Sequence, residues 1–169
     1  ASNVKELRDL LQAASDRKRR AGQRTVLFID ELHRFNRAQQ DVLLPDVELG
    51  TVILVGATTH NPFFALNTPL ISRSQIFQFK PLGEEAIRVL LLRALRDRER
   101  GLGACPVQIT EEALEHLVKM CDGDARRALN ALEVGVLSTQ PAGDGRIHFD
   151  LPLAEDSIQR KAVVYDRDE

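Results

Sequence analysis

Val26-Leu27-Phe28-Ile29-Asp30-Glu31 is the stretch of sequence that decides the fold. Its apolar part is short and rich in β-branched and aromatic residues, which predicts a strand buried on both faces. Two carboxylates follow this strand directly. A second apolar run, Thr51–Gly56, predicts another buried strand, and Ile76–Lys80 predicts a third, shorter one.

Helices are expected around these strands. Asn36, followed by Gln39 three residues later, resembles a helix N-cap and predicts a helix that runs to about Glu48. Apolar residues at helical spacing predict another helix over residues 3–15, followed by a basic loop over residues 16–24. Because strands alternate with helices, this part of the chain predicts an α/β fold with a parallel sheet flanked by helices.

After residue 81 the pattern changes to helices alone. Three are predicted, over residues 84–100, 110–121 and 124–138. Thr110 and Asp124 are the expected N-caps of the second and third. We therefore expect an α/β core over residues 1–80, a small all-helical lid domain over residues 81–140, and a linker with a short helix over residues 141–169.

Composition limits the class of protein. The chain has 169 residues, of which 43% are hydrophobic and 28% charged, and its formal net charge is −2. These values are typical of a soluble globular protein and neither demand nor exclude a nucleic-acid partner. Cys105 and Cys121 lack metal-ligand spacing and are expected to be reduced thiols in a cytoplasmic protein. No run in the sequence has the length expected of a membrane span, and its first residues do not fit the pattern expected of a signal peptide.

Polar side chains follow the first two expected strands. In open α/β sheets, ligands bind beyond the carboxyl ends of the strands. Asp30 and Glu31 there suit a magnesium–nucleotide site, in which one carboxylate holds hydrated Mg²⁺ and the other orients or deprotonates a water. Thr58 and Thr59 could hold the γ-phosphate or that water. Taken singly, these residues also fit a solvated acidic turn and ordinary turn chemistry, but together they favour the nucleotide site.

Longer strings resemble a known family. Residues 26–36 are similar to the Walker B region of the AAA+ ATPases, in their clamp-loader and Holliday-junction-motor branch. Residues 35–45 and 56–62 resemble a narrower family, which comprises the bacterial replication-associated recombination ATPases and their eukaryotic relative, the Werner helicase-interacting protein. The similarity covers nearly the whole chain. One departure is His60, where the family pattern predicts an acidic residue.

The resemblance implies a role for each residue at the strand ends. Asp30 matches the magnesium-associated aspartate of Walker B, and Glu31 matches the water-activating glutamate. Thr59 matches the sensor-1 hydroxyl, with Thr58 and Asn61 as neighbours that could share the role. The implied fold is therefore a partial AAA+ core followed by the helical lid.

Two arginines complete the implied site. Arg73 matches the arginine finger, which reaches a nucleotide on the adjacent subunit and neutralises charge on the transferred phosphoryl group; the alternative is a surface ion pair. Arg126 and its neighbour lie in the first turn of a helix, where each cation opposes the helix dipole at a cost of roughly 0.3–1 kcal/mol, so an anion nearby is favoured. The family has its sensor-2 arginine at this position. The alternative for Arg126 is an ion pair with Asp122 or Asp124.

Two further features carry weaker signals. Arg17, Lys18, Arg19 and Arg20 form a basic run that could contact DNA phosphates. A solvated loop is the alternative, because no aromatic residues interleave with the run. His33 has no His or Cys partner at ligand spacing and is expected to support the strand-to-helix turn.

The resemblance also implies what the sequence lacks. None of its ten glycines is followed by lysine, so the phosphate-binding loop motif is absent. The family has that loop upstream of Val4 and an oligomerisation region after Glu169. We therefore expect a fragment, inactive alone, of a longer, nucleoid-associated bacterial protein.

The implied function is that of an ATPase in replication-fork maintenance, recombination and repair, which uses ATP and Mg²⁺ to remodel DNA or DNA-bound protein. The implied partners are single-stranded, forked or junction DNA, a single-stranded-DNA-binding protein or other replication proteins, and further copies in a homo-oligomer, with no membrane. The alternatives are a Holliday-junction branch-migration motor, a clamp-loader subunit, and a non-catalytic adaptor of AAA+ shape.

Overall fold

The computed structural model describes residues 4–165, with side chains up to residue 159. The chain divides after Gln78 into two compact units, an α/β unit and a helical unit. This confirms the α/β fold class with short parallel sheets, and each unit has a core of its own. Across the described residues, no helix combines the length and the apolar character needed to cross a bilayer.

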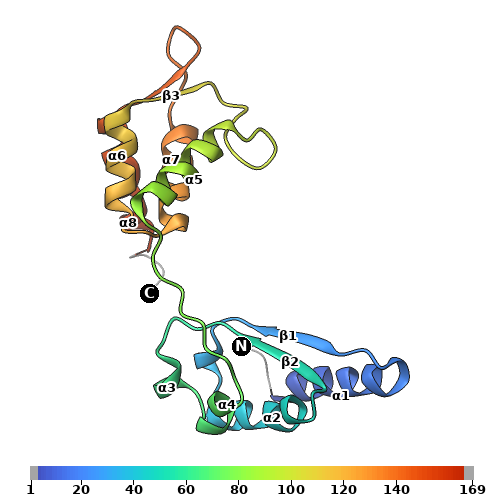
Figure 1. Ribbon diagram of the computed structural model, residues 1–169. Coiled ribbons are helices and arrows are strands. Elements are labelled where there is room, and N and C mark those ends of the chain that lie inside the picture. The colour runs from blue at the N-terminus through green and yellow to red at the C-terminus, as the bar shows by residue number, and fades with distance from the viewer. Residues whose placement is uncertain (1–3, 166–169) are drawn as a thin grey trace. The chain divides into compact units, whose positions relative to one another are not determined.

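The α/β unit is a two-stranded parallel sheet with its long helices on one side (Figure 1). Its strands are β1 (Thr25–Ile29) and β2 (Val52–Gly56), and its helices are α1 (Val4–Ala21), η1 (Leu32–Arg34), α2 (Arg37–Glu48), α3 (Pro62–Ala65) and α4 (Thr68–Ser72). Because parallel strands need a crossover connection, α2 returns the chain from the end of β1 to the start of β2.

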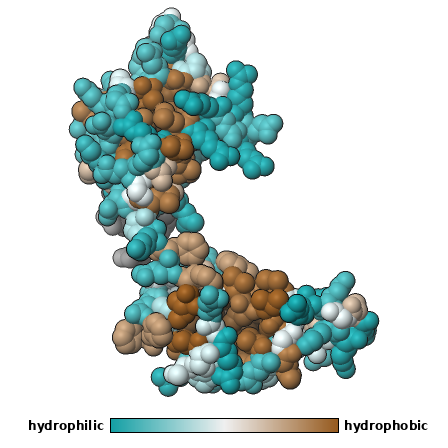
Figure 2. Space-filling view, viewed as in Figure 1, coloured by the Kyte–Doolittle hydropathy of each residue, from teal (hydrophilic) through white to brown (hydrophobic). Residues whose placement is uncertain are grey.

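Only one face of this sheet is covered. The core between the sheet and the helices consists of Leu7, Leu11, Ala14, Ile29, Leu32, Leu43, Val52 and Leu70. Val26 and Phe28 on β1 are each 63% exposed, and Ile53 and Val55 on β2 are each 43% exposed. The expectation of strands buried on both faces is therefore wrong, because no described element of this unit packs on the second face. Figure 2 shows the apolar side chains that gather there.

Two other expectations for this unit are wrong. Residues 75–83 have no regular secondary structure, so Ile76–Lys80 is not a strand. A strand needs a neighbour to bond with, and among the described residues β1 and β2 pair only with each other. The run Arg17–Arg20 lies in the last turns of α1 and not in a loop. Lysine and arginine are good helix formers, and positive charge at a helix C-terminus is favourable.

The predicted helix starts are confirmed by their hydrogen bonds. Asn36 and Gln39 form a capping box on α2, in which each side chain accepts a hydrogen bond from the other residue's backbone N–H. Thr110 and Asp124 cap the second and third helices of the helical unit. These caps fix where each helix begins, because the side-chain oxygen satisfies an N–H that has no partner within the helix.

The helical unit surrounds a fully buried aromatic ring. Its elements are α5 (Glu84–Arg96), β3 (Val107–Ile109), α6 (Glu111–Met120), α7 (Ala125–Ser138), β4 (Ile147–Phe149) and α8 (Leu151–Tyr165). Strands β3 and β4 form a short parallel pair in an otherwise helical unit, and Phe149 at the end of β4 has no exposed surface.

The helix expected within residues 141–169 is present as α8, preceded by β4. The segment is not a linker, because α8 packs against α6 and α7 with Ala154 and Ser157 buried. Residues 166–169 of the expected linker lie outside the described residues.

Candidate functional site

The parallel pairing of β1 and β2 brings the two polar strand ends to one rim. Ile29 lies opposite Gly56 in the register. Beyond the strands, the backbone N–H of Ala57 donates to the Ile29 carbonyl and the N–H of Leu32 donates to the Ala57 carbonyl, both at 2.9 Å. The residues that follow the two strands are thereby joined. The candidate carboxylates after β1 and the candidate hydroxyls after β2 share this rim.

The carboxylates sit on a sharp turn. Glu31 has φ 53° and ψ 46°, a left-handed conformation that is costly for a residue other than glycine. Leu32, only 3% exposed, anchors the turn in the core. It fits because position 56 is glycine: a Cβ there would lie 2.5 Å from the Leu32 Cδ2. The Asp30 carboxylate accepts a hydrogen bond of 3.0 Å from the Glu31 N–H.

A histidine links the two groups of side chains. The His33 Nδ1 lies 2.9 Å from the Thr58 hydroxyl oxygen, and its Nε2 lies 3.1 Å from the Glu31 Oε2. The His33 ring stacks on the ring of His60, with centroids 3.8 Å apart and planes 18° apart. The contacts of His33 with Thr58 and His60 are not signalled by any spacing rule, because they join residues 25 or more positions apart.

The three candidate sensor residues differ in what they bond. Thr58 contacts His33 and also accepts a 3.1 Å hydrogen bond from the His60 N–H. Asn61 caps α3 by accepting from the Phe63 N–H at 3.1 Å. Thr59 is exposed, and its hydroxyl makes no hydrogen bond within the described part of the chain. Of the three, Thr59 is therefore the side chain available to a ligand.

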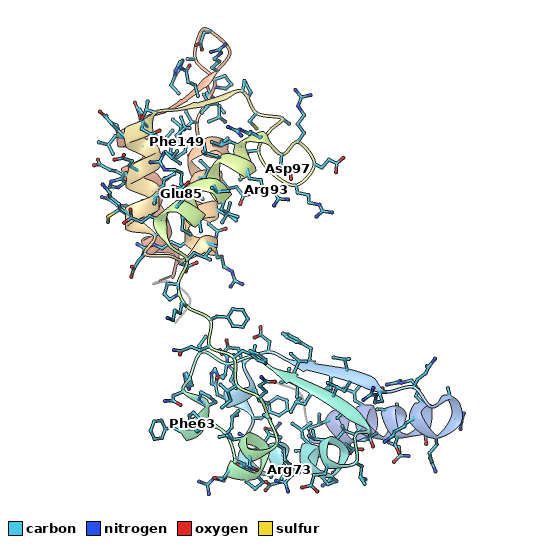
Figure 3. The ribbon with its side chains drawn as sticks, viewed as in Figure 1. Phe63, Arg73, Glu85, Arg93, Asp97 and Phe149 are labelled. Atoms are coloured by element: carbon cyan, nitrogen blue, oxygen red, sulfur yellow. The ribbon has the colours of Figure 1, made fainter. Side chains whose placement is uncertain are left out.

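Arg73, the candidate arginine finger, follows α4 (Figure 3). Its Nη2 lies 2.7 Å from the Glu48 Oε1, and its Nη1 donates to the Pro69 carbonyl at 3.0 Å. Both charged side chains are nearly half exposed, so this ion pair is weak and readily exchanged.

Arg126 lies in the helical unit, in the first turn of α7, and its side chain is exposed. The Asp124 carboxylate accepts from the Arg127 N–H at 2.9 Å and so serves as the helix cap. Within residues 4–165, Arg126 makes no ion pair with Asp122 or Asp124. Among the described residues, the Arg126 guanidinium has no ion-pair partner.

The basic end of α1 is largely engaged in the fold. Arg17 donates to the Thr25 hydroxyl, and the Lys18 Nζ donates to the Leu49 carbonyl at 2.7 Å. Arg19 pairs with Asp16, and Arg20 is exposed. These contacts tie the helix to the start of β1 and to the turn before β2, which leaves few of its charges for DNA phosphates.

The rim has the donor set of a nucleotide-bound Mg²⁺ site. No group of three His, Cys, Asp or Glu side chains that could hold a metal exists among the described residues. A Mg²⁺ ion at a nucleotide needs fewer, because phosphates and waters supply most of its ligands. The exposed Asp30 carboxylate at the rim fits that requirement.

Comparisons with known proteins point to one family. The family model for the ATPase family associated with various cellular activities (AAA) matches residues 1–82. The family model for the AAA C-terminal domain matches residues 103–169. The chain is 46% identical to replication-associated recombination protein A of Bacillus subtilis over 99% of its own length. It is 45% identical to the Escherichia coli protein of that name over 79%, and 40% identical to ATPase WRNIP1 of Dictyostelium discoideum over 80%.

The chain spans 38%, 30% and 15% of these three relatives. Among solved structures, it is similar to the FIGL-1 AAA domain in complex with ADP, with a TM-score of 0.62 and 16% identity, over 93% of this chain and 56% of the other. At that identity the likeness shows the fold alone.

Proposed function

Because the chain belongs to the AAA ATPases, in the family of replication-associated recombination protein A and WRNIP1, we propose that it carries the hydrolytic rim of a DNA-associated ATPase. The observation that supports this most is the pairing of Ile29 with Gly56, which joins the acidic end of β1 to the hydroxyl-bearing end of β2. Nucleotides bind at this edge of parallel α/β sheets.

The two carboxylates take different roles in this proposal. Asp30 is exposed and holds Mg²⁺ together with phosphate oxygens and waters. The bound ion neutralises charge on the phosphates. Glu31, held by its turn and by His33, orients the attacking water and accepts its proton.

Three other side chains complete the proposal. Thr59 offers its unoccupied hydroxyl to the γ-phosphate or to the water. Arg126, exposed at the start of α7, contacts the γ-phosphate. Arg73 exchanges Glu48 for the nucleotide of an adjacent subunit in a homo-oligomer, where it stabilises the charge of the transition state.

The biological setting is proposed from the names of the relatives. Replication-associated recombination protein A and WRNIP1 support an ATPase that remodels DNA or DNA-bound protein at replication forks during recombination and repair. Partners would be single-stranded, forked or junction DNA and replication proteins such as a single-stranded-DNA-binding protein. The basic end of α1 is a minor candidate for DNA contact, with Arg17, Arg19 and Arg20 as its exposed members.

The test is Glu31→Gln in the full-length protein, with ATPase rate and ATP affinity measured with and without forked DNA. Removing the general base should lower kcat by about 10²–10⁴-fold while the affinity for ATP changes little. Glu99→Gln makes the same chemical change on an exposed loop of the helical unit and should leave both quantities unchanged.

Near-normal hydrolysis by Glu31→Gln would remove Glu31 from its role. Absence of hydrolysis in the unsubstituted full-length protein would instead favour the adaptor alternative. In that case this protein would be an inactive subunit that supplies Arg73 to the ATP site of a neighbouring active subunit. Arg73→Ala should then still lower the ATPase rate of that neighbour.

A further inference from the structure

We infer that Thr58 is a positioning residue for Glu31, acting through His33, and that it does not contact the nucleotide. This inference rests on the proposed function, since it concerns how the catalytic glutamate is held. It assigns separate roles to two adjacent hydroxyls, whereas the family resemblance matches Thr59 to the sensor and leaves Thr58 as a neighbour that could share its role. Thr58 lies on the protein side of the site, and Thr59 faces the ligand.

The hydrogen bonds of His33 determine which nitrogen carries its proton. An ionised Glu31 carboxylate can only accept, so the His33 Nε2 at 3.1 Å must donate to it. In a neutral imidazole the other nitrogen is then an acceptor. The Thr58 hydroxyl, 2.9 Å from the Nδ1, is the group that donates to it.

The remaining hydrogen-bonding capacity of the Thr58 hydroxyl is also used. Its oxygen accepts the His60 N–H at 3.1 Å, which turns the single hydroxyl proton toward His33. Among the described residues, the only other acceptor within reach is the His60 carbonyl, at a longer 3.5 Å. A hydroxyl with its donor and its acceptor both engaged inside the protein is poorly suited to a phosphate.

The surroundings hold the His33 ring in one plane. The His60 ring stacks on it at 3.8 Å, and the His33 side chain is only 11% exposed. Glu31, at the other end of this hydrogen-bonded chain, has a left-handed backbone conformation. Such a conformation persists only where contacts with the surrounding residues hold it in place. The Thr58–His33–Glu31 chain fixes one carboxylate oxygen and leaves the second to accept a proton from water.

The kinetic test uses four variants of the full-length protein, Thr58→Val, Thr58→Ser, His33→Ala and the double variant Thr58→Val/His33→Ala. Valine keeps the shape of threonine and removes the hydroxyl, so kcat should fall by about 10-fold or more with KM for ATP within about 2-fold, because a misplaced base slows chemistry without weakening binding. Thr58→Ser should restore most of kcat.

The double variant decides whether Thr58 acts through His33. If it does, Thr58→Val should have no further effect once His33 is alanine, so the two losses are not additive. Thr59→Val is the matched comparison, because it makes the same change at the neighbouring position. It should raise KM or lower kcat, and its effect should add to that of His33→Ala when the two substitutions are combined. Additive losses for Thr58→Val, or a KM effect with kcat unchanged, would overturn the inference.

An independent readout is the ¹⁵N NMR spectrum of the His33 ring, which requires no hydrolysis. We expect a protonated Nε2 and an unprotonated, hydrogen-bonded Nδ1, with the Nδ1 hydrogen-bond signature lost in Thr58→Val and retained in Thr58→Ser. A proton on Nδ1 in the unsubstituted protein would refute the scheme. If Glu31→Gln abolishes hydrolysis but Thr58 and His33 prove independent, this inference fails and the proposed function stands.

Discussion

The two units of this chain bury their apolar residues in different ways. In the helical unit, α5 to α8 enclose a core whose central ring, Phe149, has no exposed surface. In the α/β unit, α1 and α2 cover one face of the sheet and leave apolar side chains on the other, with Phe28 63% exposed. The core of the helical unit is therefore enclosed on all sides, whereas the sheet of the α/β unit is covered on one face only.

This difference shows where stability and chemistry reside. The core residues of the helical unit pack against one another, so substitutions in this core should act mainly on stability. The α/β unit carries the carboxylates, hydroxyls and strained turn of the candidate site on a sheet of only two strands. Isolated two-stranded sheets are marginal, so this unit depends on the helices beneath it.

The largest expected effect is that of Phe149→Ala. Removing a fully buried ring should lower the free energy of unfolding of the helical unit by about 3–5 kcal/mol. Phe28→Ala, the matched change on the exposed face of β1, should cost less than about 1 kcal/mol. Urea denaturation combined with amide hydrogen exchange would assign each loss to its unit. Equal losses would contradict the contrast between the two cores.

A smaller effect is expected for Gly135→Ala in α7. A Cβ at this position would lie 2.5 Å from the Phe149 ring and 3.3 Å from the Ser157 Cβ. The overpacking should cost about 1–3 kcal/mol, although alanine is the better helix former. Gly143→Ala meets no atom within 4 Å and serves as the control. A stabilised Gly135→Ala protein would show that α7 and α8 are not closely packed.

The helix caps should have similar effects in the two units. Asn36→Ala removes half of the capping box on α2, and Asp124→Ala removes the cap of α7. Each should cost roughly 1 kcal/mol, measured by thermal denaturation with helical content followed by circular dichroism. A negligible loss at Asn36 alone would mean that the α/β unit is held by the packing of α2 and not by its start.

These caps are also the features that the sequence predicts best. A cap involves atoms within four residues of one another, so Asn36 with Gln39, Thr110 and Asp124 are visible in the sequence itself. The strand ends at Asp30 and Gly56 are predicted for the same reason, because an apolar run stops there. Local chemistry defines these points.

Features that depend on distant partners are predicted poorly. Ile76–Lys80 has the composition of a strand, but it has no neighbouring strand among the described residues and forms none. The run Arg17–Arg20 is polar enough for a loop, yet it extends α1. Its contacts with Thr25 and the Leu49 carbonyl are not signalled by the run itself. The link from Thr58 through His33 to Glu31 exists only once two loops meet at the rim.

The smallest expected effect concerns two exposed aspartates, one in each unit. In the α/β unit, the Arg19 guanidinium bonded to Asp16 lowers the pKa of that carboxyl. In the helical unit, the backbone N–H groups of Arg100 and Glu99 lower the pKa of the Asp97 carboxyl. Both folded-state pKa values lie below the unfolded ones. Each group therefore adds stability above its unfolded pKa and loses it as the pH falls through the folded value.

Salt should separate the two causes. At 1 M ionic strength the Debye length is only about 3 Å, so attraction between exposed charges is screened, whereas a turn held by backbone amides persists. Raising the salt concentration should move the pKa of Asp16 back toward its ordinary value and leave that of Asp97 low, as NMR titration of the two carboxyls would measure. Arg19→Gln should reproduce the effect of salt on Asp16. Parallel movement of both pKa values would mean that attraction between charges lowers the pKa of Asp97, as it lowers that of Asp16, and that the local backbone hydrogen bonds do not.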